Sequence, residues 1–406
     1  WAVPACSTAM PVPSPRSEPG LTGKEAVVFV TRSIYLDHNA GAPARPEVIA
    51  AMAEILAMPG NPSSVHGCGR RARAAMEAAR RAVAAACGAD PAGIVFTSGG
   101  TEANALALRG CGRPRLLVSA IEHASVREAV PGARLIAADS DGLVDLAALE
   151  CLLAEDDVPA LVSVMLANNE TGIVQPVSEI VRLAHARGAL VHCDAAQALG
   201  RLPLALSELG VDFLTLSAHK AGGPAGIGCL AMAKPDISLA PILLGGGQEK
   251  RRRGGSENLA GIAGFAAAAA LAAAEVWSGE VPARMGMLRD GLEATLADKV
   301  PAAKVVGGTV PRLCNTSCLI LPGVPAQIQV MALDLAGVMV SAGAACSSGK
   351  VTTSPVLAAM GLSAGEADCA VRVSLGPESR AEDMEAFLAA WGDLARRKGK
   401  TVKDAA

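Results

Sequence analysis

The segment with the clearest chemical content is 214–228, LTLSAHKAGGPAGIG, in which Lys220 follows an apolar run and precedes several glycines. Polar groups just beyond the carboxyl end of a parallel strand lie where open α/β sheets bind their ligands. A lysine at this place is either an ordinary surface lysine or an amine that forms a Schiff base with a carbonyl cofactor. The neighbouring segments decide between these interpretations.

Two more polar residues lie at and just beyond the end of the preceding apolar run, 189–194: Asp194 and Gln197. A carboxylate at a buried strand end is costly unless it is paired. Asp194 is therefore either a helix cap or the partner of a pyridinium nitrogen, which it would keep protonated as the chemistry of pyridoxal phosphate requires. In the second case Gln197 could reach the phenolic oxygen of the same ring.

The segment 96–108, FTSGGTEANALAL, predicts a strand, a glycine turn and a helix. Backbone N–H groups at such a helix start, with the hydroxyl of Thr101, suit a phosphate, although the same residues also serve ordinary helix starts. His123 follows another predicted strand, where a histidine is either a structural hydrogen-bonding residue or a catalytic one.

These polar residues must be positioned by the elements around them. Short apolar runs alternate with alanine-rich helical stretches such as 70–86 and 177–187, which predicts a largely parallel sheet covered by helices. The predicted strands of this region are 94–97, 116–119, 160–167, 189–194 and 213–217. From residue 282 the order becomes helix, strand 304–306, strand 315–321, helix 326–336, strand 370–374 and a last helix from 379, which indicates an α+β layer.

We therefore predict an α/β fold with two domains. The large cofactor-binding domain spans 50–277 and ends in a long helix over 257–275. The smaller α+β domain combines 34–49 with 278–406. Residues 1–33 form a flexible extension, for which a transit peptide is the alternative interpretation.

Composition excludes several classes of protein. The 406 residues are 51% hydrophobic and 18% charged with a net charge of -3, which argues against a disordered chain and against a nucleic-acid binder driven by global charge. The eleven cysteines have no paired CxxC spacing, so we predict neither a disulfide framework nor a metal site, and a reducing cytoplasm fits. The longest uncharged apolar run, 259–274, is shorter than the roughly 20 residues of a membrane span, so we predict none.

A series of strings, in order along the chain, resembles the NifS/IscS-type cysteine desulfurases, which are pyridoxal-phosphate enzymes of the class V aminotransferase family with the type I fold. The strings are YLDHNA from Tyr35, NPSSVHGCGR from Asn61, TSGGTEAN from Thr97, EHASV from Glu122, ANNETGIVQP from Ala167, HCDAAQALG from His192, SAHKAGGPAGIG from Ser217, GGGQEKRRRGGSEN from Gly245, SAGAACSSGK from Ser341 and VRVSLG from Val371. The SAGAACSSG string and its loop length resemble the long-loop group of these enzymes.

The resemblance implies roles around the cofactor. Lys220 would form the Schiff base, Asp194 would bond the pyridinium nitrogen and Gln197 the phenolic oxygen, while His123 would stack on the ring and assist proton transfer. The residues implied to hold the phosphate are Gly100, Thr101, Ser217 and His219. Ser256, where the family usually has threonine, would reach the phosphate of a neighbouring subunit, which implies a homodimer. The basic run 250–253 lies where the family carries arginines beside that phosphate, and as a nucleic-acid footprint it is weak.

The resemblance also implies the substrate side of the site. Arg372 would bind the carboxylate of L-cysteine, as a guanidinium fork does well, with Asn39 contacting the carboxylate and Asn169 the cofactor side. Cys346, among small residues, would accept the substrate sulfur as a persulfide and pass it to an acceptor such as an iron–sulfur scaffold protein, leaving alanine. A selenocysteine lyase or another β-eliminating enzyme of this fold is the nearest rival, and an inactive scaffold homologue is the rival from another class.

Overall fold

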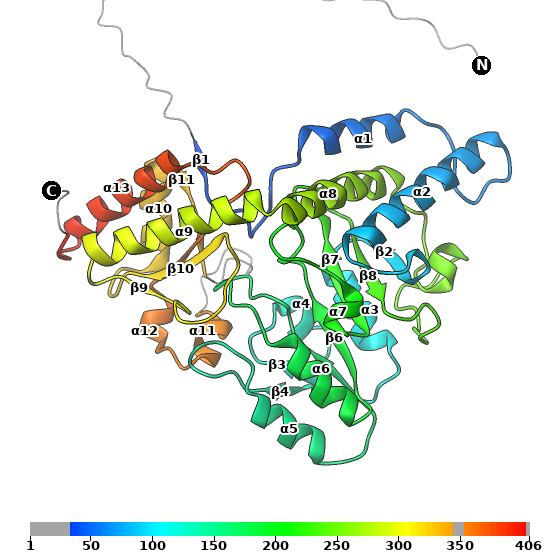
Figure 1. Cartoon of the computed structure of the whole chain (residues 1–406), viewed down its shortest axis with the longest axis horizontal. Coiled ribbons are helices and arrows are strands. Elements are labelled where there is room, and N and C mark those ends of the chain that lie inside the picture. Colours follow the sequence, from blue (N-terminus) through cyan, green and yellow to red (C-terminus); the bar gives the residue numbers. More distant parts are fainter. Residues whose placement is uncertain (1–32, 344–352, 403–406) are drawn as a thin grey trace, which may run out of the picture. The chain divides into compact units, whose positions relative to one another are not determined.

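A computed structural model of the chain describes residues 33–343 and 353–402 (Figure 1). The predicted extension, apart from Ser33, and the predicted nucleophile Cys346 lie outside the described residues.

The larger sheet has seven strands in the order β2-β8-β7-β6-β5-β3-β4. Its pairings are parallel except those of β8, which runs antiparallel to both β2 and β7. The strands are β2 (Ile94–Thr97), β3 (Arg115–Ser119), β4 (Arg134–Ile136), β5 (Ala160–Ser163), β6 (Leu190–Asp194), β7 (Phe213–Ser217) and β8 (Gly228–Met232). The mostly parallel sheet is thus confirmed, whereas β4 and β8 had no counterpart among the predicted strands and β5 ends four residues before its predicted limit.

Helices cover both faces of this sheet. Alternate residues of a strand enter different cores: in β2, Ile94 and Phe96 pack with the helices of one face and Val95 with those of the other. One face is covered by α2 (Gly67–Ala86), α5 (Leu146–Ala154), α6 (Val177–Ala186) and α8 (Leu259–Ser278), and the other by α3 (Gly100–Gly110) and α4 (Ala124–Arg127). The remaining elements of this region are α1 (Pro46–Leu56), α7 (Leu206–Leu209) and the 3-10 turns η1 (Pro91–Gly93), η2 (Ala218–Lys220) and η3 (Gln248–Arg251).

Helix α8 is long and apolar enough to cross a membrane, by length and composition alone. Its residues Ile262, Phe265, Ala269 and Ala272 are buried in the core beside the sheet, and the helix packs against α1 and α2. This burial explains the apolar run as the inner face of a core helix.

The second sheet has four antiparallel strands in the order β12-β13-β10-β9, and a separate parallel pair joins β1 to β11. A second core lies between this sheet and α9, α10 and α13, with Trp391 and Phe387 fully buried in it. The elements are β1 (Ile34–Tyr35), α9 (Glu280–Lys299), β9 (Lys304–Val305), β10 (Thr316–Ile320), α10 (Ala326–Leu335), β11 (Val338–Met339), β12 (Ser341–Ala342), α11 (Pro355–Ala359), α12 (Ala364–Ala367), β13 (Ala370–Ser374) and α13 (Ala381–Arg397). The α+β layer is confirmed, and the domain limits given above stay a prediction.

Candidate active site

A cavity of about 430 Å³ opens at the carboxyl ends of β6 and β7. Among the residues that line it are Asn39, Gly100, Thr101, His123, Asn169, Asp194, Gln197, Ser217, His219, Lys220 and Arg372. The structure thus brings together the described residues predicted to contact cofactor or substrate, except Ser256 and the basic run 250–253. This gathering follows from the topology, because parallel strands end at the same edge of the sheet and the turns after them meet there.

Asp194 ends β6 and is buried, with 7% of its surface exposed. One carboxylate oxygen, Oδ1, accepts the backbone N–H of Ala196 at 2.9 Å, and the other, Oδ2, accepts Nδ2 of Asn104 at 2.8 Å. Both contacts are with neutral donors. Among the described residues no cationic side chain pairs with this carboxylate, which leaves it suited to a cationic ligand.

Lys220 lies in the 3-10 turn η2, directly after β7. Its Nζ donates to the carbonyl oxygens of Asn39 at 2.7 Å and Ala40 at 2.9 Å. Gln197 reaches the same segment, since its Nε2 donates to the Asn39 carbonyl at 3.0 Å. The amine of Lys220 is thus held at the cavity by the segment that follows β1.

One end of the cavity combines the start of α3 with the end of β7. Gly100 and Thr101 open α3, and Ser217 Oγ lies 3.0 Å from Nδ1 of His219. Burial, with Lys220 close by, lowers the pKa of His219 to about 4, so this ring is neutral at physiological pH. Hydroxyls, a neutral imidazole and the N–H groups of a helix start together form a set of donors suited to a phosphate.

His123 precedes α4 and caps it, because its Nδ1 accepts the backbone N–H of Ser125 at 3.1 Å. The Ser125 hydroxyl lies 2.8 Å from the same nitrogen and accepts Nδ2 of Asn104 at 2.9 Å. The ring of His123 is therefore oriented on its Nδ1 side by the chain itself, and it lines the cavity.

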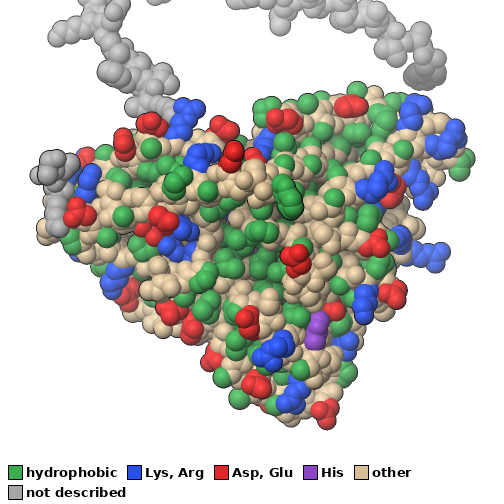
Figure 2. Space-filling view, in the orientation of Figure 1, with side chains coloured by type: hydrophobic (Ala, Val, Ile, Leu, Met, Phe, Trp, Pro, Cys, Tyr) green, Lys and Arg blue, Asp and Glu red, His purple; other side chains and the backbone are tan. Residues whose placement is uncertain are grey.

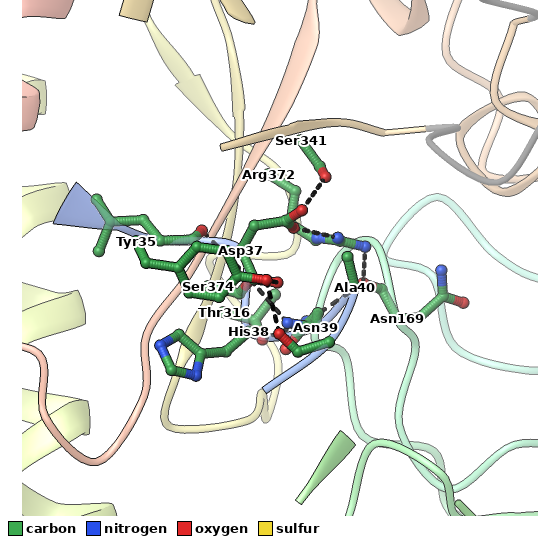
Figure 3. Close-up of polar contacts among 12 residues, drawn as sticks. Tyr35, Asp37, His38, Asn39, Ala40, Asn169, Thr316, Ser341, Arg372 and Ser374 are labelled. Carbon is green, nitrogen blue, oxygen red and sulfur yellow. Dashed lines mark hydrogen bonds and ion pairs between the residues drawn. The ribbon is translucent and has the colours of Figure 1, made fainter. Parts of the chain in front are cut away.

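The opposite side of the cavity is formed by Arg372 of β13, whose polar contacts Figure 3 shows. The buried guanidinium donates through Nη2 to Asp37 Oδ1 at 2.7 Å and through Nη1 to the Asn169 carbonyl at 3.0 Å. Asp37 also accepts the Ser341 hydroxyl at 2.7 Å. Arg372 is thus already held by an acidic partner, which its position in the sequence did not indicate.

Asn39 connects this side to the small sheet. Its Nδ2 donates to Thr316 Oγ1 at 2.9 Å and to the Asn169 carbonyl at 3.2 Å, and its backbone N–H donates to Ser374 Oγ at 3.0 Å. Figure 3 shows these side chains converging from the segment after β1 and from β10 and β13. Asn39 therefore links the segment after β1 to β10 and β13, and it also lines the cavity.

Several participants were not foreseen from the sequence. Asn104 and Asp37 were missed, although Asn104 is the lone polar residue of the helical stretch 103–108 and Asp37 stands within the first string quoted above. Arg201 was missed as well: it is buried, donates to the carbonyl oxygens of Gln197 at 2.9 Å and Lys220 at 3.2 Å, and contacts Oε1 of Gln197. Burial lowers the pKa of Arg201 to about 10.

The residues of the cavity fit pyridoxal phosphate. Three buried polar atoms at the cavity, Oδ1 of Asn104, Oδ1 of Asn169 and Nε of Arg372, have no hydrogen-bond partner within the described residues. Buried polar atoms are rarely left unpaired, so these atoms indicate a polar ligand. Donors for a phosphate, a carboxylate for a ring nitrogen and a lysine amine line the same cavity, and this is the donor set that the cofactor requires.

Ser256 does not line this cavity. It lies with Arg253 at a separate pocket of about 180 Å³, and Arg253 pairs with Glu102 of α3 at 2.9 Å. Within one chain the hydroxyl of Ser256 thus stands apart from the other predicted phosphate contacts. Its predicted role, which requires a second subunit, stays a prediction.

The basic run 250–253 is engaged by the chain itself. Lys250 donates to the carbonyl of Ala92 at 3.1 Å, and Arg252 contacts the carbonyl of Pro235. Figure 2 shows acidic and basic side chains interspersed over most of one face, with basic ones gathered toward the α2 end. Among the described residues no group of three or more His, Cys, Asp or Glu could hold a metal ion.

Comparison with known proteins agrees with this geometry. The model of the class V aminotransferase family matches residues 34–387. A cysteine desulfurase of Cereibacter sphaeroides is 41% identical over 370 residues, which cover 87% of this chain and 94% of that protein. The X-ray structure of a NifS-like protein from Rickettsia africae aligns with a TM-score of 0.84 and 35% identity, covering 90% of this chain and all of that one. A structure described as SspA in complex with cysteine aligns with a TM-score of 0.72 and 27% identity over 86% of this chain and 100% of its own. The chain belongs to the class V aminotransferase family, in the group that includes the cysteine desulfurases.

Proposed function

We propose that this protein is a cysteine desulfurase, which converts L-cysteine to L-alanine with pyridoxal phosphate and transfers the sulfur through Cys346 to an acceptor. The observation that carries the proposal is the single cavity in which a lysine amine, a buried carboxylate and a buried arginine converge, Lys220, Asp194 and Arg372. The name of the relative from Cereibacter sphaeroides and the cysteine complex of the SspA structure support the substrate.

The cofactor would be held from both ends. Its phosphate would take the donors at the start of α3 and the end of β7, and Asp194 with Gln197 would bind its ring. Bound in this way, pyridoxal phosphate supplies an electron sink that stabilises negative charge on the Cα of an amino acid. Ser256 would complete the phosphate site of a partner subunit, so we propose a homodimer.

The chain's own residues would then orient the substrate and move its protons. Arg372 would bind the substrate carboxylate, with Asn39 beside it, and so fix how Cα is presented for reaction, while Asn169 would contact the cofactor side. Lys220 would remove the Cα proton as general base, because its amine lies in the same cavity. The side chain of L-cysteine would have to come within reach of the Cys346 thiol.

The sulfur step would be a displacement on the substrate thiol. The Cys346 thiolate would attack that sulfur, so that an S–S bond forms while the Cβ–S bond breaks and its electron pair stays with the carbon skeleton. Protonation of this skeleton gives alanine, and the enzyme keeps a persulfide. No external oxidant is needed, because the substrate carbon is reduced as its sulfur is oxidised. A second thiol, on an acceptor such as an iron–sulfur scaffold protein, would then take the terminal sulfur, and the reducing cytoplasm suits such thiols.

The deciding experiment measures alanine formed from L-cysteine under anaerobic conditions with excess reductant, by the cofactor-loaded wild type and by Cys346→Ala. Cys151→Ala is the matched control, because Cys151 is an exposed cysteine on α5 and does not line the cavity. We expect alanine from the wild type and from Cys151→Ala and none from Cys346→Ala. Equal alanine from all three would contradict the persulfide step and favour direct elimination, and no alanine from any of them would contradict the proposed function.

A further inference from the structure

Asn104 joins the two residues expected to act on the cofactor ring. It is buried on α3, and the two hydrogens of its Nδ2 are both engaged, by Asp194 Oδ2 at 2.8 Å and by Ser125 Oγ at 2.9 Å. The opposite orientation of the amide would set its carbonyl oxygen against the carboxylate, so the orientation with Nδ2 toward Asp194 is the favourable one. Asn104 thus connects the end of β6 to the start of α4.

The next contact determines where the ring proton of His123 lies. The backbone N–H of Ser125 can only donate, and it donates to His123 Nδ1 at 3.1 Å. The Ser125 hydroxyl, 2.8 Å from the same nitrogen, accepts from Asn104 and therefore has its own hydrogen available for Nδ1. With two donors on Nδ1, the neutral ring must carry its proton on Nε2, on its other side.

We propose that Asn104 and Ser125 are positioning residues, which hold Asp194 and His123 in one hydrogen-bonded chain and fix His123 as the neutral tautomer protonated at Nε2. In the resting enzyme His123 is then a hydrogen-bond donor and not a base. A neutral His123 ring would also avoid the charge repulsion that an imidazolium would meet beside the protonated pyridine ring of pyridoxal phosphate. The identity of the ligand in this proposal rests on the proposed function. The tautomer of His123 does not, because it follows from the hydrogen bonds alone.

The tautomer can be tested directly by ring ¹⁵N chemical shifts in the histidine-labelled holoenzyme, in which His123→Gln identifies one signal among the six histidines. We expect the wild type to show protonation at Nε2. Ser125→Ala removes one of the two donors and should shift the equilibrium measurably toward protonation at Nδ1, whereas Ser125→Thr keeps the hydroxyl and should resemble the wild type. A wild type protonated at Nδ1, or Ser125→Ala shifts equal to those of the wild type, would overturn the proposal.

The chain offers a matched control in a second serine–histidine pair. Ser163, at the end of β5, has its Oγ 2.8 Å from Nδ1 of the buried His192, which lies on the same strand, β6, as Asp194. Ser163→Ala should change the signals of His192 and leave those of His123 as in the wild type. A similar change at His123 in Ser163→Ala would show a general loosening of the sheet and would contradict a specific role for Ser125.

The role of Asn104 is tested by measuring the affinity and the absorption spectrum of bound pyridoxal phosphate. Asn104→Ala should raise the dissociation constant of pyridoxal phosphate about tenfold and shift the absorption maximum of the bound cofactor, because Asp194 loses a hydrogen bond. Asn104→Ser, with one donor in place of two, should lie between it and the wild type and serves if Asn104→Ala does not fold. Unchanged affinity and spectrum in both variants would overturn the role of Asn104. A wild type that binds the cofactor but makes no alanine would sink the proposed function and leave this test intact.

Discussion

The two walls of the cavity are built on different principles. The wall from the large sheet consists of polar residues within a few positions of the strands they follow. Local contacts orient its histidines, Ser217 with His219 and Ser125 with His123, although Asp194 and Lys220 also have partners far along the chain. The wall from the small sheet depends on contacts between distant parts of the chain. Its central ion pair joins Asp37 to Arg372, 335 positions apart.

The walls also differ in charge. On the large-sheet side, burial, with Lys220 close by, lowers the pKa of His219 to about 4 and keeps its imidazole neutral. On the small-sheet side the buried guanidinium of Arg372 is balanced by the carboxylate of Asp37, which a substrate carboxylate would have to share. The first wall is therefore preorganised for a ligand that brings its own charges, whereas the second must exchange or share an existing ion pair when a carboxylate binds.

The largest effect should come from the large-sheet wall. Lys220→Ala should lower the rate of alanine formation by about a thousandfold or more, because it removes the amine that would act as general base. The two contacts of Nζ with backbone carbonyls are lost as well, but thermal unfolding should change little. Lys234→Ala is the matched control, since Lys234 is an exposed lysine that does not line the cavity. A Lys220→Ala enzyme that kept a tenth of the activity would contradict this division of roles.

The second prediction concerns the small-sheet wall. Arg372→Lys should lower kcat/KM for L-cysteine by about a hundredfold, chiefly through KM. A compact ammonium lacks the planar fork that can grip a substrate carboxylate with two hydrogen bonds while its other N–H groups hold Asp37 and the Asn169 carbonyl. Steady-state kinetics measures this split.

Asp37→Asn sharpens the same test, because it keeps a hydrogen-bond acceptor and removes the charge. If Asp37 only positions Arg372, the rise in KM should stay below about tenfold, since the guanidinium remains held through the Asn169 carbonyl. A larger rise in Asp37→Asn than in Arg372→Lys would show that the ion pair, and not the guanidinium itself, organises this wall.

The contrast between the walls also explains what the sequence could predict. Strand limits at 94–97, 213–217 and 370–374 agree with β2, β7 and β13, because each run contains β-branched residues among apolar ones. The residues that follow such strands at the carboxyl edge of the sheet gather in the cavity, so proximity in sequence was enough to find them. Strand β8 was missed, because its short apolar segment directly follows a glycine-rich stretch. No local residue pattern indicates that the chain turns back to pair antiparallel with β7.

Pairings across the chain could not be predicted in this way. The contacts of Arg372 with Asp37 and of Asn104 with Asp194 depend on which elements pack together, and the latter residues are 90 positions apart. A single sequence gives the type of a polar residue and its element, but its partner is fixed only when both elements occupy their places in the fold. The predicted nucleophile Cys346 lies outside the described residues, so its placement stays a prediction.

The smallest predicted effect concerns a carboxyl group behind the small-sheet wall. Glu170 is buried, and its Oε2 accepts the Ser354 hydroxyl at 2.5 Å. Burial raises the pKa of Glu170 to about 7, while the Ser354 hydroxyl and Arg372 limit the rise. The folded protein therefore binds this proton more tightly than the unfolded chain does, and stability due to Glu170 is fully present below pH 4.5 and is lost as the pH rises through about 7.

Glu170→Gln removes this dependence, because the amide stays neutral at every pH. The free energy of unfolding of Glu170→Gln minus that of the wild type should therefore increase by about 2 kcal/mol between about pH 5 and pH 7, measured by chemical denaturation. Glu366→Gln is the control with the opposite shift: Lys304 lowers the pKa of this exposed carboxyl to about 2, so its difference from the wild type should be flat over the same range. Parallel curves for Glu170→Gln and the wild type would mean that Glu170 stays ionised against Arg372. The small-sheet wall would then hold two carboxylates on one guanidinium, and a substrate carboxylate would have to displace one of them.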